Sequence, residues 1–159
     1  MSELNHRFPH AHLSGQDGRF VEFSVDGYEF PDKQLRSEGF DHDANWLFVI
    51  FRVSDGRRTW SSRDAAWLTT DLPRLSAWLR AAADGGHPDD WTALEPLLTL
   101  CVEDEPLSVV ARLALELRSE DVRMSDIRDE AIELNPTADE LLQAADVVDQ
   151  ALDGFPVRD

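Results

Sequence analysis

Residues 46–53 read WLFVIFRV, and this stretch decides the fold. Its apolar side chains alternate between the two sides of an extended segment: one set is Trp46, Phe48 and Ile50, and the other is Leu47, Val49 and Phe51. A strand that is apolar on both faces is typical of the interior of a sheet. We therefore predict a central strand at residues 46–53. Residues 54–56 (SDG) predict a hairpin turn, and residues 57–64 predict a more polar return strand.

The chain upstream of this hairpin predicts a second strand at residues 19–25, where apolar and polar side chains alternate strictly. Asp26-Gly27 predicts a tight turn into residues 28–30. Residues 31–45 are polar and rich in turn-forming residues, so we expect a loop there. Residues 1–18 lack apolar periodicity and predict a loosely ordered lead-in.

Three further strands are predicted in the second half of the chain. Leucine and valine alternate with smaller residues over residues 98–102, and the acidic, proline-containing residues 103–106 predict a turn. Residues 109–117 form the longest alternating series and predict a strand, although their alanine and leucine content also permits a helix. Residues 131–134 predict one more short strand.

Two amphipathic helices are also predicted. The first begins at residues 69–71, whose oxygen-bearing side chains can cap a first turn, and stops at Gly85-Gly86; its apolar stripe is Leu72, Leu75, Leu79 and Ala82 beside Trp78. The second begins with Thr137-Ala138-Asp139-Glu140, which is a capping box, and ends at Gly154. Its buried stripe is Leu141, Ala145, Val148 and Leu152.

These elements predict an α+β fold with an antiparallel sheet of about six strands packed with two amphipathic helices. The 159 residues show no internal repeat, linker or low-complexity tract, so we expect a single domain over residues 1–159. The sequence contains neither a secretory signal nor an apolar stretch of membrane-spanning length. We therefore expect a cytoplasmic protein.

The overall charge limits the classes of partner. Fifteen basic residues against 32 acidic residues give a formal net charge of -17. This charge repels nucleic acid and anionic membranes and attracts a basic protein surface. We therefore expect no nucleic-acid or membrane partner.

The residue types that carry most enzyme chemistry do not form a recognisable motif. The single cysteine, Cys101, lies between Leu100 and Val102 in a predicted strand, which favours a buried structural thiol over a nucleophile. No nucleophile elbow, phosphate-binding loop or dinucleotide fingerprint occurs in the sequence. We therefore predict a protein that is not an enzyme and uses no cofactor.

Two stretches resemble metal sites only in part. His6, His10 and His12 fall in the predicted lead-in without a fixed further ligand, so we interpret them as solvated surface residues. Residues 41–45 begin like a calcium loop, but Trp46 replaces the required glycine and Arg52 replaces the bidentate glutamate. We expect no metal.

The five tryptophans are numerous for this length and raise the question of an interface. Trp46 and Trp78 fall on apolar stripes and are predicted to be core residues. Trp67 and Trp91 lie at element boundaries, where partial exposure would allow an interface role, but the general preference for burial favours the core.

The informative anomaly is the placement of acidic residues. Residues 129–157 contain no lysine or arginine, and carboxylates near the C-terminal end of the last helix oppose its dipole by about 0.3–1 kcal/mol. An outward face is predicted opposite the buried stripe and consists of Asp139, Gln143, Asp146, Gln150 and Asp153. Our candidate partner-binding residues are Asp139, Asp146, Asp149 and Asp153. The alternative is that a very acidic protein scatters carboxylates everywhere.

A set of landmarks occurs in a fixed order: Asn45-Trp46-Leu47, Val53, Trp60, Asp64, Leu68-Thr69, Leu72, Leu75, Trp78-Leu79, Glu95-Pro96, Leu115-Glu116-Leu117-Arg118 and Phe155-Pro156. In this order they resemble the WapI family of bacterial immunity proteins over residues 25–158. The chain departs from the family pattern at Ser119-Glu120-Asp121, where a proline and aromatic residues often follow.

The resemblance implies an antidote to a contact-dependent toxin encoded beside it. We therefore expect a non-enzymatic cytoplasmic immunity protein that binds a cognate toxin domain with a basic surface. The alternative is a small acidic protein-binding or regulatory domain unrelated to toxins. A toxin domain encoded just upstream would distinguish the first hypothesis from the second.

Overall fold

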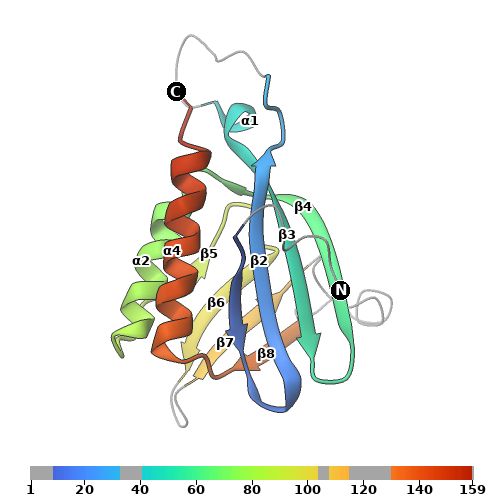
Figure 1. Cartoon of the computed structure of the whole chain (residues 1–159), viewed down its shortest axis with the longest axis vertical. Helices are drawn as coiled ribbons and strands as arrows, with labels where there is room; N and C mark the ends of the chain where they lie inside the picture. Colours follow the sequence, from blue (N-terminus) through green and yellow to red (C-terminus); the bar gives the residue numbers. More distant parts are fainter. Residues whose placement is uncertain (1–8, 33–40, 104–107, 115–129, 159) are drawn as a thin grey trace.

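The computed structural model describes residues 9–32, 41–103, 108–114 and 130–158. These residues form two antiparallel four-stranded sheets beside a pair of long helices (Figure 1). The predicted α+β class is confirmed. The strands are divided between two sheets instead of forming the single sheet that we expected.

The first sheet has the order β1-β2-β3-β4. Its strands are β1 (Ala11–Ser14), β2 (Arg19–Tyr28), β3 (Trp46–Asp55) and β4 (Thr59–Leu68). Strand β3 pairs with β2 on one side and with β4 on the other, so the predicted central strand is confirmed. The predicted hairpin is also present, and the carboxylate of Asp55 accepts hydrogen bonds from the two backbone amides that follow Gly56.

Two predictions for the N-terminal third are wrong. The expected lead-in contains β1, because Ala11 and Leu13 are buried when the strand pairs with β2; residues 1–8 lie outside the described residues. The expected tight turn at Asp26-Gly27 is instead a β-bulge, and β2 continues to Tyr28. Gly27 has a φ of 142°, which side-chain-bearing residues rarely adopt, so the glycine lets the strand absorb the irregularity.

The second sheet has the order β5-β6-β7-β8. Its strands are β5 (Trp91–Thr92), β6 (Leu98–Glu103), β7 (Ser108–Leu113) and β8 (Glu130–Leu134). Strand β7 confirms the strand prediction as far as Leu113, while residues 115–117 and 104–106 lie outside the described residues. We did not predict β5, which is too short to produce a periodic pattern.

Three helices complete the described residues. The short α1 (His42–Asn45) lies in the expected loop, and Asp41 caps it by accepting a 3.2 Å hydrogen bond from the amide of Ala44. Helix α2 (Asp71–Ala83) and helix α4 (Ala138–Gly154) confirm the two predicted amphipathic helices. The expected side-chain cap of α2 is wrong, because the Asp71 carboxylate accepts from the amide of Leu68, which precedes the helix.

The long helices lie side by side with opposite chain directions (Figure 1), and α4 also packs against β1. No helix within the described ranges is long and apolar enough to cross a membrane.

One core is shared by both sheets and both long helices. Trp67 of β4 is fully buried and makes edge-on ring contacts with Phe23, Phe51 and Trp91, with centroid distances of 5.2, 5.6 and 5.4 Å. These contacts join the first sheet to β5 of the second. The favoured burial of Trp67 and Trp91 is therefore confirmed, whereas Trp46 is only partly buried and its predicted core position is wrong.

The residues after α4 return to α1 and form a contact that we call the C-terminal clasp, made of Tyr28, Asn45, Pro156 and Arg158. The side chain of Asn45 donates to the Arg158 carbonyl at 2.7 Å and accepts from the Arg158 amide at 2.8 Å. The Arg158 guanidinium donates to the carbonyls of Phe30, Pro31 and Ala44 and lies 3.9 Å from the centre of the Tyr28 ring. The Tyr28 hydroxyl donates to the Pro156 carbonyl.

Candidate partner-binding site

Helix α4 presents its predicted polar side to the outside. The buried side chains of this helix are Leu141, Ala144, Ala145 and Val148. The residues of the predicted outward face are all exposed and form what we call the acidic helix face: Asp139, Gln143, Asp146, Gln150 and Asp153. The three- and four-residue spacing explains why these side chains share one side of the helix.

The beginning of α4 is fixed by the predicted capping box. The Thr137 hydroxyl accepts from the Glu140 amide at 3.0 Å, and the Glu140 carboxylate accepts from the Thr137 amide at 3.3 Å. The same carboxylate oxygen accepts a 2.7 Å hydrogen bond from the Ser14 hydroxyl in β1. The capping box therefore also attaches the helix to the first sheet and sets the direction in which the acidic helix face points.

Two of the four candidate carboxylates share one cation from α2. Arg80 lies 3.0 Å from Asp146 and 2.6 Å from Asp149, and all three side chains are substantially exposed. Hydrogen bonds from this guanidinium to Asp149 and then to Asp146 raise the pKa of Arg80 above its ordinary value. We did not predict a role for Arg80, because the helical period marks it as exposed but does not say which element lies beside it.

Asp139 and Asp153 are placed differently from this pair. Among the described residues, neither has an ion pair. Asp139 lies in the first turn of α4, where a carboxylate suits the helix dipole, while the last turn contains no basic residue to offset Asp153. The four candidate residues therefore divide into a central pair that Arg80 partly neutralises and two end positions that face solvent.

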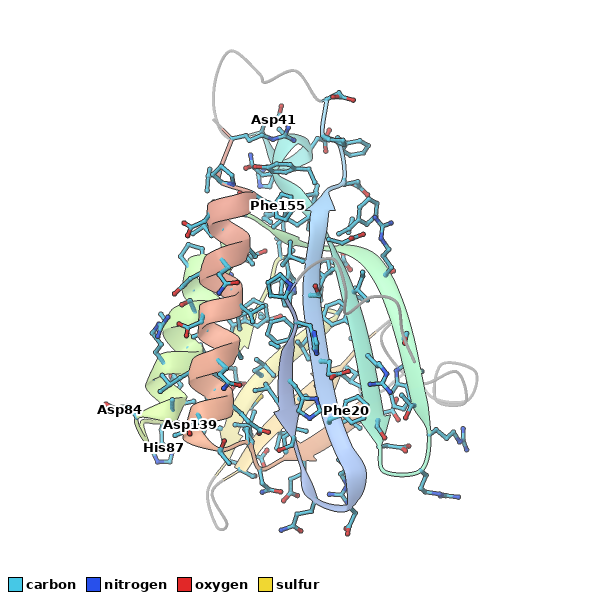
Figure 2. All side chains as sticks on the ribbon, viewed as in Figure 1. Phe20, Asp41, Asp84, His87, Asp139 and Phe155 are labelled. Carbon is cyan, nitrogen blue, oxygen red and sulfur yellow. The ribbon has the colours of Figure 1, made fainter. Side chains whose placement is uncertain are left out.

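A groove lies between the end of α2 and the start of α4. It has a volume of about 430 Å³, and its lining residues define the interhelical groove: Arg80, Ala81, Ala83, Asp84 and Leu142. Figure 2 places Asp84 and Asp139 at the same end of the helical pair. We did not single out Leu142 or Asp84 from the sequence, although an apolar residue on the polar side of an amphipathic helix was a usable signal.

The other candidate residues have structural contacts. Cys101 is buried, as predicted, and burial followed by a hydrogen bond with Asp90 raises the pKa of its thiol to about 11. A thiol with this pKa is almost entirely protonated near neutral pH, so it is a poor nucleophile. Asp41, which begins the calcium-like stretch, serves as the cap of α1.

His10 and His12 both approach Glu22 of β2, at 3.8 and 2.8 Å, while His6 lies outside the described residues. Burial alone would raise the pKa of Glu22, but hydrogen bonds from His12 and Arg52 outweigh it and hold this pKa below its ordinary value. In the part of the chain that the structure describes, no group of three or more histidine, cysteine or acidic side chains could hold a metal ion.

Comparison with known proteins connects this architecture to a family. Residues 12–156 match the Immunity protein WapI-like family. The matched segment begins in β1 and ends just beyond α4, so it contains both sheets and both long helices. No curated protein and no solved structure matches the chain.

Proposed function

The chain belongs to the WapI-like immunity protein family, and from this premise we propose that it neutralises a cognate bacterial toxin in the cytoplasm by binding it directly. The observation that carries the proposal is the family match, which extends over residues 12–156. An antidote that acts by occupation needs a surface complementary to its toxin and no chemistry of its own.

The acidic helix face supports a basic toxin surface as the partner. The chain has a formal charge of -17, and the stretch from residue 129 to 157 holds no lysine or arginine. Charges of opposite sign on two proteins accelerate their encounter and orient them before contact. The exposed carboxylates of Asp139, Asp146, Asp149 and Asp153 therefore suit a toxin that uses a basic cleft for a polyanionic substrate, because they offer the negative charge of such a substrate.

The first experiment tests neutralisation. The toxin domain encoded directly upstream is expressed with and without this chain, and growth and copurification are measured. We expect protection from the toxin and a stable complex. A well-folded chain that neither protects nor copurifies would reject toxin immunity and favour the alternative of an acidic protein-binding domain with another partner.

The second experiment tests the role of charge. We expect Asp139→Asn/Asp153→Asn to associate with the toxin several-fold more slowly than the parent at low salt, since charges near an interface act mainly on the association rate. Asp17→Asn/Asp43→Asn is a matched control, because both residues are exposed, lie outside the long helices and carry the same total charge. Equal association rates and salt slopes for the two double variants would show that the acidic helix face has no special role.

A further inference from the structure

The interhelical groove combines an apolar floor with negative charge. Leu142 is 40% exposed, and only three other large hydrophobic residues are comparably exposed among those that the structure describes: Phe30, Leu94 and Val157. None of these three lies in α2 or α4. On the other side of the groove, Ala81 and Ala83 provide small apolar side chains, and Asp84 adds an exposed carboxylate directly after α2.

Carboxylates surround this apolar floor. Asp139 lies one turn before Leu142 on α4 and Asp146 lies one turn after it, so both flank the same side of the helix. Arg80 is the one cation in the groove lining, and Asp146 and Asp149 already hold it. The described groove surroundings thus contain four carboxylates, Asp84, Asp139, Asp146 and Asp149, against one guanidinium.

We propose that the interhelical groove is the anchoring site for an arginine side chain of the toxin, an inference that rests on the proposed function. The aliphatic part of arginine can cover Leu142 and the two alanines, as long basic side chains commonly do on apolar surfaces. Its planar guanidinium can donate in parallel to the carboxylate of Asp84. Arginine is also among the residues that most often dominate binding energy at protein interfaces.

The test compares two variants that carry the same substitution at different places. Leu142→Arg puts a cation into the groove, whereas Leu94→Arg puts the same cation on another exposed leucine, between β5 and β6. The two variants have identical composition and net charge, so the long-range attraction to the toxin falls equally in both. With the upstream-encoded toxin domain as the probe, we expect Leu142→Arg to bind about a hundredfold more weakly than Leu94→Arg, because juxtaposed like charges at an interface cost several kcal/mol. Thermal unfolding of both variants checks that they are folded.

A second pair of variants identifies the occupant. We expect Asp84→Asn to raise the dissociation rate about tenfold relative to Asp17→Asn, because a guanidinium in the groove would lose its charged acceptor. If Asp84→Asn dissociates like its control while Leu142→Arg fails to bind, the occupant is apolar and the arginine proposal is rejected.

The outcomes separate the groove from the general function. If the parent binds the toxin and Leu142→Arg binds as well as Leu94→Arg, the groove proposal is overturned and toxin immunity stands. If the parent does not bind the toxin at all, the proposed function fails and the groove proposal fails with it.

Discussion

The C-terminal clasp and the acidic helix face treat polar side chains in opposite ways. In the clasp, Asn45 is fully buried, and both atoms of its amide group make hydrogen bonds to the backbone or to Thr69. On the acidic helix face, Asp139 and Asp153 project into solvent and form no ion pair within the described residues. The fold uses the polar groups of the clasp, whereas the charge of the helix face exceeds what folding needs. Substitutions should therefore affect stability in the first region and binding in the second.

The largest stability effect is expected for Asn45→Ala. The change would leave the Thr69 hydroxyl, the Arg158 amide and two carbonyls without their partner in a buried place. We expect the free energy of unfolding to fall by about 3 kcal/mol, measured by urea denaturation. Asn135→Ala is the matched control at an exposed asparagine and should change stability little. Equal effects for the two variants would contradict the importance of the clasp.

A smaller loss is expected for Arg158→Ala, which removes the hydrogen bonds to the carbonyls of Phe30, Pro31 and Ala44. Because Phe30 and Pro31 are exposed, water can replace part of what is lost. We expect a loss of about 2 kcal/mol in the free energy of unfolding. Arg57→Ala, at an exposed arginine in the β3–β4 hairpin, should be close to neutral. A neutral Arg158→Ala would limit the clasp to Asn45.

Thr137→Ala tests the attachment of the helix face to the fold. The substitution removes the acceptor for the Glu140 amide, and we expect it to reduce the free energy of unfolding by about 1 kcal/mol. Thr59→Ala is the control at an exposed threonine. An unchanged urea midpoint for Thr137→Ala would show that the Glu140–Ser14 contact alone holds the start of α4.

The smallest effects are expected on the acidic helix face, and their signs should differ between its ends. Asp153→Asn removes an unfavourable charge from the last turn of α4, while Asp139→Asn removes a favourable one from the first turn. We expect a gain of about 0.5 kcal/mol for the first variant and a similar loss for the second, with both effects reduced by salt. A loss above 1 kcal/mol for Asp153→Asn would mean that this carboxylate belongs to the fold.

The sequence predicted the elements whose signal is local and periodic. Strand β3, helix α2 and helix α4 with its capping box were all found in this way. Strand β1 was missed because only Ala11 and Leu13 face the core, and two residues give no period. The bulge at Gly27 was taken for a turn because Asp-Gly is common in both.

The candidate site shows the same limit. The outward direction of Asp139, Asp146 and Asp153 follows from helical spacing alone. The pairing of Asp146 with Arg80, 66 residues away in the chain, depends on which helix packs against α4, and no local pattern encodes this. Asn45 stood out only as part of a family landmark, since its partner Arg158 is 113 residues further on.

That separation has a consequence for how the protein is made. During synthesis, the hairpin of β3 and β4 can form as soon as its residues leave the ribosome, because its contacts are close in sequence. Asn45 must wait for Arg158, so the corner around α1 stays open on the ribosome until nearly the whole described chain has emerged. Closing so long a loop costs little more entropy than closing one of half its length, which means that the delay is set by translation and not by the search for the contact. A nascent chain arrested before Arg158 should therefore be cut readily by protease near residue 45, and release of the full chain should remove that sensitivity.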